Sequence, residues 1–170
     1  MVRSTETGIV TRRVLDAVRE ASEANPNLLI IADSRRSLRG YPPASLKMNA
    51  AELALFFNAS SQLSIDEIRD KALSLAAEYG RHVFVTMAER GILGAYHGTV
   101  EVVPALPVRG EIDIVGAGDA VTANLTAALS AGASLREALE IAQLAASIVI
   151  HQLGTTGTAT PAQMLELLKD

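Results

Sequence analysis

The residues of this chain best suited to chemistry are Asp113 to Asp119, which read DIVGAGD. They follow a strand-like run and precede an alanine-rich segment with helical apolar spacing up to Gly132, so the sequence predicts a helix that begins at residues 116–118. Small residues in such a turn leave the backbone N–H groups pointing outward, and the helix dipole adds partial positive charge. The turn therefore predicts a phosphate site, with the Asp119 carboxylate placed to accept a proton from an incoming hydroxyl.

This pattern also has an ordinary structural explanation. Acidic residues are favoured in the first turn of any helix, and glycines mark ordinary turns. A G-x-G-D sequence by itself is therefore more often structural than functional, and other parts of the chain must support an active site.

Polar residues also follow two apolar runs that have the character of buried strands. Residues 28–32 (LLIIA) predict a strand buried on both faces of a parallel sheet, and Asp33-Ser34-Arg35-Arg36 follows it. Residues 82–86 (HVFVT) predict a second strand, followed by a loop from Thr86 to Gly91. Open α/β sheets bind ligands at the carboxyl ends of their strands, so both loops are placed to contact one. A solvated loop is the alternative explanation for the polar residues after residue 32.

Asn49 and Glu52 stand three residues apart at the start of a predicted helix that runs through Phe57. This spacing is the reciprocal capping pattern, in which each side chain binds the backbone N–H of the other residue. A cap explains both residues, and the spacing alone favours it. The functional alternative is that the two polar groups orient water molecules around a magnesium ion at this strand-to-helix switch.

The remaining elements alternate between helices and buried strands. A helix is predicted after Thr11, and capping patterns begin further helices at Ser64, Ser134 and Thr160. Two short strands flank His97-Gly98 and predict a hairpin. The alternation predicts a single doubly wound α/β domain over residues 1–170, with a mostly parallel sheet flanked by helices and the functional loops at one edge.

The composition excludes several classes of function. The 170 residues include no cysteine, which rules out disulfides and thiolate zinc sites. The net charge is -4 and the basic residues are scattered, so we expect no nucleic-acid partner. No apolar run approaches the ~20 residues that span a bilayer, so we expect no membrane segment. Residues 1–8 lack the apolar core of a signal peptide, which predicts a cytoplasmic protein.

Several motifs, in this order, resemble the ribokinase-like, or PfkB, family of carbohydrate kinases. Asp113 to Asp119 is similar to the family's D-x-x-G-A-G-D signature, and Asn49-x-x-Glu52 is similar to its upstream N-x-x-E motif. Residues 86–91 (TMAERG) resemble the nucleotide-contacting T-x-G-x-x-G loop, with Ala88 where a glycine is usual. The resemblance covers essentially the whole chain but only the carboxyl-terminal portion of a family member. It implies a ribokinase-like fold whose lid and amino-terminal sugar-contacting portion are missing.

The resemblance implies a kinase that uses Mg-ATP. Asp119 would be the catalytic base, and the N–H groups of Gly116, Ala117 and Gly118 would stabilise charge on the transferring γ-phosphoryl group. Glu52 and Asn49 would hold magnesium through water. The residues implied in nucleotide binding are Asn49, Thr86, Glu89, Gly91 and Gly118, together with Gln143, which stands where relatives place a residue near the adenine.

The resemblance also implies a site for a monovalent cation such as K⁺. Its ligands would be the Asp113 carboxylate, the Thr158 hydroxyl and the carbonyls of Val115, Val149, Gln152 and Gly154. A loop that simply ends a helix is the alternative explanation for Gly154 and Thr158.

Within the family, Asp33-Ser34-Arg35, Tyr41 and residues 152–160 look most like the heptose-7-phosphate kinases that feed ADP-heptose synthesis, although this chain carries extra residues between L-G-T and A-T. The implied acceptor is therefore a sugar or a sugar phosphate. Two alternatives stay open: a nucleotide-binding module without catalysis, and a kinase of another acceptor such as a nucleoside. A truncated family member would expose apolar surface, so we expect self-association into a homo-oligomer.

Overall fold

The computed structural model describes residues 10–35, 37–60 and 62–169. Residues 1–8, on which the cytoplasmic prediction depends, and Arg36 lie outside these ranges. The helices of the described part are α1 (Arg12–Ala24), α2 (Ala50–Phe56), α3 (Ile65–Tyr79), α4 (Ala117–Ser130), α5 (Leu135–Val149) and α6 (Pro161–Leu167). Its strands are β1 (Ile31–Asp33), β2 (Ser45–Asn49), β3 (Val83–Thr86), β4 (Ile92–Tyr96) and β5 (Thr99–Val103).

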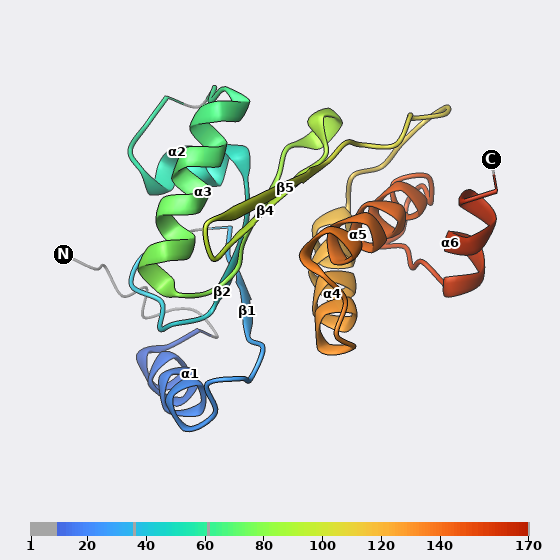
Figure 1. Cartoon of the computed structure of the whole chain (residues 1–170). Coiled ribbons are helices and arrows are strands. Elements are labelled where there is room, and N and C mark those ends of the chain that lie inside the picture. The colour runs from blue at the N-terminus through green and yellow to red at the C-terminus, as the bar shows by residue number, and fades with distance from the viewer. Residues whose placement is uncertain (1–9, 36, 61, 170) are drawn as a thin grey trace.

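The five strands form one sheet in the order β1-β2-β3-β4-β5. β1, β2 and β3 pair in parallel, whereas β4 pairs antiparallel with both β3 and β5, so β4 runs opposite to the other strands (Figure 1). The predicted α/β fold, with a sheet flanked by helices, is confirmed, and the sheet is mixed because two of its four strand pairings are antiparallel. The predicted hairpin is β4 and β5, with His97-Gly98 as its turn.

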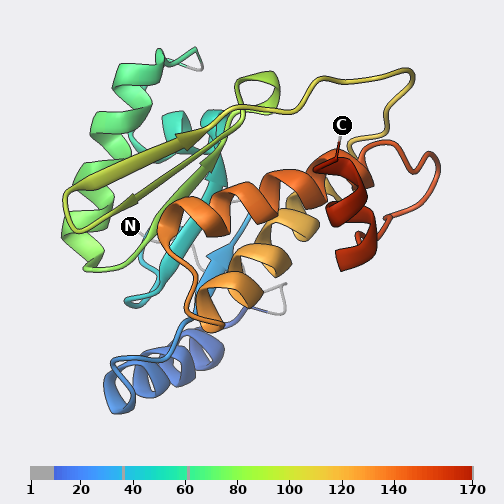
Figure 2. The same cartoon turned by 45° about the vertical axis from the view of Figure 1, so that its right-hand side comes forward.

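Helices cover both faces of this sheet (Figure 1 and Figure 2). On one face, α2 and α3 pack over Leu46, Met48 and Val85, among other residues. On the other face, α4 and α5 pack over a core that includes Phe84. Successive side chains of a strand point to opposite faces, so Lys47 of β2 lies on the α4 side, between two residues that belong to the other core.

The predicted helix starts are confirmed. At Asn49, Ser64, Ser134 and Thr160, the side chain accepts a hydrogen bond from the third helical amide and the reciprocal bond is also made. Each cap satisfies backbone donors that a helix leaves without an internal partner. These local interactions fix where the helices begin, and at Asn49 the cap lies directly at the end of β2.

The strand predicted at residues 28–32 is wrong in its bounds and in its burial. β1 covers only Ile31–Asp33, and Leu28 is 45% exposed. β2 begins at Ser45, which lies opposite Ile31, so residues 28 and 29 have no strand beside them. Among the described strands, β1 pairs with β2 alone. An apolar run indicates a strand, but the ladder decides where the strand begins.

The chain leaves the sheet between β5, the strand before the DIVGAGD motif, and the motif itself. Residues 104–114 form neither a strand nor a helix. Pro104 and Pro107 lack the N–H donors that a ladder needs, which explains why the chain leaves the sheet after β5.

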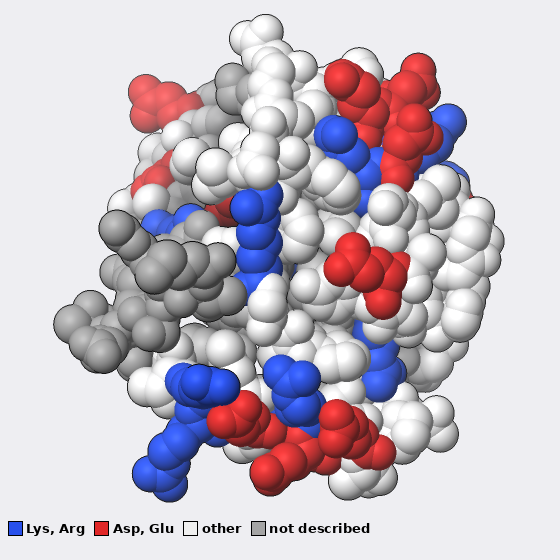
Figure 3. Space-filling view, turned by 90° about the vertical axis from the view of Figure 1, so that its left-hand side faces the viewer, with Lys and Arg blue, Asp and Glu red and all other residues white. Residues whose placement is uncertain are grey.

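On the side of the molecule formed by α1, α2 and α3, basic and acidic side chains are interspersed rather than gathered by sign (Figure 3). Within the described residues, every helix is too short or too polar to cross a bilayer.

Candidate active site

The predicted turn before α4 is present, and it depends on glycine. Gly116 is the N-cap of α4 with φ 85° and ψ -13°, and no side chain caps this helix. A Cβ atom on Gly116 would lie 2.0 Å from the carbonyl oxygen of Thr156. Both the positive φ and this close approach require glycine. The loop around Thr156 therefore packs directly against the turn that the sequence predicts to be the phosphate site.

The amides of this turn differ in whether they already donate a hydrogen bond within the chain. The Ala117 amide donates to the Ile114 carbonyl at 3.2 Å, and the Ala120 amide makes a helical bond to Gly116 at 2.9 Å. Between them lie the Gly118 and Asp119 amides, in the turn where a helix offers its own donors no acceptor. These two amides are the best-placed donors for an anion. The Asp119 amide was not predicted as part of the site, and the Ala117 amide is engaged within the turn.

Asp119 occupies the third position of α4, and its side chain is exposed. Further along the same helix, Val121 and Leu125 are buried in the core beneath the sheet. The helix is thus anchored by its apolar side, while Asp119 in its first turn is exposed. A carboxylate placed in this way is accessible to a hydroxyl, as its predicted role as a base requires.

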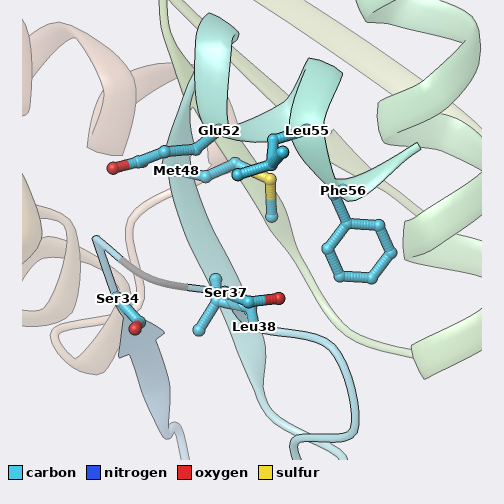
Figure 4. A pocket seen from close by; sticks show the side chains of 7 residues that line it. All are labelled: Ser34, Ser37, Leu38, Met48, Glu52, Leu55 and Phe56. Atoms are coloured by element: carbon cyan, nitrogen blue, oxygen red, sulfur yellow. The ribbon is translucent and has the colours of Figure 1, made fainter. Parts of the chain in front are cut away.

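Asn49 and Glu52 form the cap that their spacing favoured. Asn49 Oδ1 accepts from the Glu52 amide at 2.8 Å, and Glu52 Oε2 accepts from the Asn49 amide at 2.8 Å. Glu52 also lines a small hollow, together with Ser34, Ser37, Leu38, Met48, Leu55 and Phe56. Its side chain extends away from the Phe56 ring (Figure 4). The role of both residues in holding magnesium stays a prediction.

The loop that resembles T-x-G-x-x-G leaves the end of β3 at Thr86 and forms a single 3-10 turn over Ala88–Arg90. Ala88 has φ 52°, a left-handed conformation that favours the glycine usual at this position. Gly91 has φ 92°, and a Cβ atom there would lie 2.0 Å from the Val103 carbonyl oxygen. Backbone packing therefore explains Gly91 completely, and nucleotide contacts by Thr86, Glu89 and Gly91 stay predictions.

Hydrogen bonds link several of the residues predicted to hold a monovalent cation. Asp113 accepts from the Val115 amide at 2.9 Å and from the Gly154 amide at 3.2 Å. The Gln152 side chain pairs with the Thr158 backbone through two bonds of 2.7 and 2.9 Å. These bonds close the loop after α5 onto the turn before α4, which supports the alternative of a helix-ending loop. A cation there stays a prediction.

Gln143 and Val149 lie on α5, with Gln143 half-buried and Val149 buried. A position on this helix does not show whether Gln143 would lie near the adenine ring of a bound nucleotide. This contact stays a prediction.

An ion pair beside the turn was not predicted from the sequence. Lys47 Nζ lies 2.8 Å from Asp33 Oδ2, and their side chains are 7% and 27% exposed. The Thr122 hydroxyl lies 3.3 Å from the same Asp33 oxygen and 3.0 Å from the Gly118 carbonyl oxygen. The one available signal was a lysine inside an otherwise buried strand, SLKMN.

Known proteins identify the family. Residues 11–163 match the family described as pfkB family carbohydrate kinase. This chain belongs to the pfkB family. The curated relatives include the bifunctional protein HldE of Azorhizobium caulinodans, 33% identical over 150 residues that cover 87% of this chain and 31% of that protein. HldE of Bradyrhizobium sp. (strain ORS 278) is 34% identical over 157 residues, which cover 90% and 31% of the two chains. This pfkB chain therefore spans about a third of these relatives.

Solved structures agree on the fold. Ribokinase of Arabidopsis thaliana, complexed with ribose and ATP, superposes with a TM-score of 0.76 at 23% identity, covering 93% of this chain and 51% of that one. Ribokinase of Cryptococcus neoformans in complex with ADP gives 0.71 at 26% identity, covering 91% and 56%. Phosphofructokinase-2 of Escherichia coli in complex with potassium gives 0.66 at 24% identity, covering 74% and 40%. The fold is ribokinase-like.

Proposed function

We propose that this chain is the nucleotide-binding and catalytic portion of a carbohydrate kinase, which transfers the γ-phosphoryl group of Mg-ATP to a hydroxyl of a sugar or sugar phosphate. The observation that carries the proposal is the uncapped glycine turn at the start of α4, with an exposed carboxylate in that same turn. Membership of the pfkB family supports it.

In the proposed reaction, the acceptor oxygen attacks the γ-phosphorus while the bond from that phosphorus to the β,γ-bridging oxygen breaks, and ADP leaves. Asp119 accepts the proton of the attacking hydroxyl. The Gly118 and Asp119 amides donate to the phosphoryl oxygens, on which negative charge is spread in the transition state. Phosphoryl transfer needs mainly positioning and electrostatic stabilisation, which a rigid turn on an anchored helix supplies.

We assign the cofactor roles to oxygen atoms that the hydrogen bonds of the fold leave unused. Glu52 uses Oε2 in its cap, which leaves Oε1 for a water ligand of magnesium. Magnesium bound with ATP needs few protein carboxylates because it keeps several waters and the phosphates as ligands. When bound, the ion supplies positive charge to the phosphates. For K⁺, the loop closed by Asp113 and Gly154 is the proposed place.

For the acceptor, we propose a heptose phosphate or a related sugar phosphate. The residues that resemble heptose-7-phosphate kinases, and the HldE relatives at 33% and 34% identity, favour this class over a nucleoside. The nucleoside alternative predicts transfer to adenosine or a related acceptor instead. A panel of heptose 7-phosphate, ribose, fructose 6-phosphate and adenosine distinguishes the acceptors.

The proposal is tested with the whole 170-residue chain by titrating Mg-ATP in a calorimeter and following transfer of labelled γ-phosphate to the panel. Asp119→Asn should lower transfer by about 10²–10⁴-fold, the usual contribution of a general base, while Mg-ATP still binds. Asp66→Asn is the matched control because Asp66 is an exposed acid in the first turn of α3. Near-normal transfer by Asp119→Asn would remove Asp119 as the base.

A second candidate is a nucleotide-binding module without catalysis. The observation that favours it is that the matched region spans only 31% of the HldE relatives. This candidate predicts that Mg-ATP binds but that no acceptor of the panel is phosphorylated. If Mg-ATP does not bind either, both candidates are wrong.

Self-association into a homo-oligomer is part of the proposal. Val14 on α1 is 40% exposed and Leu28, just before β1, is 45% exposed, so apolar surface is open on this side. Light scattering over a concentration series measures the expected rise in mass, and a constant monomer mass would contradict it.

A further inference from the structure

Helix α1 is amphipathic, but its apolar residues take no part in the interior of the fold. The apolar face carries Val14, Ala17, Val18 and Ala21, which recur at the spacing of one side of a helix and are called the α1 stripe below. Among the residues that the structure describes, neither hydrophobic core includes a side chain of α1, and Ser22 is the one buried residue of this helix. An apolar face that covers no core is typical of a contact surface.

Polar contacts hold α1 at its carboxyl end. The Ser22 hydroxyl donates to the Pro43 carbonyl at 2.8 Å, in the loop before β2. Arg81, in the turn before β3, donates to Ser22 Oγ at 3.2 Å and to the Pro26 carbonyl at 2.7 Å. The helix lies at one end of the sheet, away from the helices that cover the two faces (Figure 1 and Figure 2). It is thus fixed to the fold without using the α1 stripe.

The α1 stripe is part of a larger apolar surface. Thr11, Arg13 and Ile30 line the same hollow as the four residues of the stripe. Val14 is 40% exposed, and Val10, which precedes the helix, is 48% exposed. The surface therefore continues from the helix toward the strand β1.

The charges of α1 oppose its own dipole. Arg12 and Arg13 stand in the first turn, where the dipole is positive, and Glu20 and Glu23 stand toward the carboxyl end, where it is negative. The first turn carries no acid and the last turn carries no base. Both placements are unfavourable within a single helix. An antiparallel partner helix makes them favourable, because its acidic carboxyl end then lies beside the basic first turn.

A second copy of α1 fits these features. In an antiparallel two-fold pair the same surface of both copies makes the contact. If Val14 lies opposite Ala21 of the second copy, then Ala17 lies opposite Val18 of the second copy. Each valine therefore meets an alanine, and pairing large with small side chains lets two helices interdigitate closely.

Charged residues beside the stripe are self-complementary in the same arrangement. Arg13 and Glu20 each precede a stripe residue by one position and are two helical turns apart, so they flank the stripe on the same side. The antiparallel pair brings Arg13 of one copy toward Glu20 of the other, twice by symmetry. Charge and apolar size therefore favour the same register.

We propose that α1 forms an antiparallel two-fold contact with α1 of a second copy of this chain, through the α1 stripe and through ion pairs between Arg13 of each copy and Glu20 of the other. This inference rests on the self-association that is part of the proposed function, and it names the surface. The stripe is small, so the dimer should be weak and should dissociate on dilution. The residues proposed for catalysis and nucleotide binding lie on other elements, so Mg-ATP affinity should not depend on this contact.

The test exchanges the charges beside the stripe in the whole chain. Arg13→Glu leaves only glutamates facing one another in the dimer, and Glu20→Arg leaves only arginines. Each variant alone should raise the dimer dissociation constant at least about 10-fold in sedimentation equilibrium, because two attractive pairs become repulsive. An equimolar mixture of the two variants should dimerise as the unmodified chain does, because every arginine again faces a glutamate.

Two controls separate this contact from general effects of charge. Arg69→Glu reverses an exposed arginine on α3 and should leave the dissociation constant unchanged. The chain contains no cysteine, so an introduced thiol reports proximity between copies. Ala17→Cys should give a disulfide-linked dimer on oxidation, because position 17 lies next to the two-fold axis, whereas Asp66→Cys on α3 should stay monomeric.

The outcomes are distinct from those of the proposed function. If the unmodified chain associates but the mixture of Arg13→Glu and Glu20→Arg does not regain its affinity, this inference is wrong and self-association through another surface stands. A constant monomer mass, as expected if a segment of the same chain covers the stripe, would overturn both this inference and the self-association. If the mixture regains its affinity but Mg-ATP does not bind, the kinase proposal is wrong and this inference stands.

Circular dichroism checks the folding of each variant. Should a charge variant not fold, the cysteine pair decides the matter. Equal yields of disulfide-linked dimer from Ala17→Cys and Asp66→Cys would overturn the inference.

Discussion

Helices α4 and α5 pack against each other, but their amino ends differ in how they satisfy the backbone donors. At α5, Ser134 accepts from the Glu137 amide at 3.3 Å, and Glu137 accepts from the Ser134 amide at 2.8 Å. At α4, glycine is the N-cap and no side chain caps the helix, although Asp119 occupies the position that corresponds to Glu137. The third helical position therefore carries an acid in both helices, but only the acid of α5 takes part in a cap.

The difference shows how a helix end is either closed by its own chain or left available to a ligand. A serine N-cap and a glutamate at the third position close the end with the chain's own oxygens. A glycine N-cap removes the capping oxygen, and no side chain takes its place at α4. An acid in a first turn thus indicates structure when a capping side chain precedes it, and it favours function when only small residues do.

Among the tests of this comparison between the amino ends of α4 and α5, we expect the largest effect from the substitution Gly116→Ala. The substitution combines a left-handed φ with a Cβ atom 2.0 Å from the Thr156 carbonyl, so we expect it to lower the free energy of unfolding by more than about 2 kcal/mol and to abolish Mg-ATP binding. Gly132→Ala is the matched control, because Gly132 has φ 89° with nothing within 4 Å of the added atom. Equal losses of stability in urea denaturation would show that the contact with Thr156 has no energetic role.

A smaller effect is expected at the closed helix end. Ser134→Ala should lower the free energy of unfolding by about 1 kcal/mol, the usual cost of losing an N-cap, without changing Mg-ATP affinity. Asp119→Asn should change stability much less, because Asp119 makes no cap of this kind. Urea denaturation and calorimetry on the two variants measure both quantities. A variant Ser134→Ala with weakened Mg-ATP binding would contradict the division into a structural and a functional end.

A further prediction concerns how stability depends on pH, through His82 at the beginning of β3. His82 precedes β3 and stacks on Tyr96 with ring centroids 3.8 Å apart. Burial, aided by the charges of His97 and Arg81, lowers the pKa of His82 from 6.5 to about 4. The unfolded chain therefore binds this proton more readily, so stability should be constant above about pH 6.5 and should fall as the pH decreases toward 4.

His82→Phe should remove this dependence, as measured by thermal unfolding across that pH range. Mg-ATP affinity at neutral pH should not change, because His82 lies at the far end of the strand from the candidate site. His97→Gln serves as the control and should keep most of the slope. An unchanged slope in His82→Phe would assign the titration to another group.

The smallest effect is expected in the nucleotide loop. Ala88→Gly relieves a left-handed φ of 52° but gives the unfolded chain more freedom, so the free energy of unfolding should stay the same or rise by up to about 1 kcal/mol. Ala127→Gly, at an exposed position inside α4, should instead lower it by about 1 kcal/mol. Equal destabilisation in both variants would mean that Ala88 carries no strain.

The sequence by itself determined the features that depend on neighbours along the chain. Reciprocal caps at Asn49, Ser64, Ser134 and Thr160, the hairpin at His97-Gly98 and the glycine turn before α4 all form within a few residues. Their residue types decide the local conformation almost regardless of the rest of the fold. This is why the α/β class and the position of Asp119 in a first helical turn followed from the sequence.

The tertiary structure decided what depends on distant segments. The Thr156 carbonyl against Gly116, the ion pair between Lys47 and Asp33, and the start of β1 at Ile31 each join residues more than ten positions apart in the chain. No spacing rule reports such contacts, because they arise only when the sheet aligns its strands and α4 docks upon it. The surroundings of the proposed phosphate site are therefore a property of the fold, whereas its central turn is a property of the sequence.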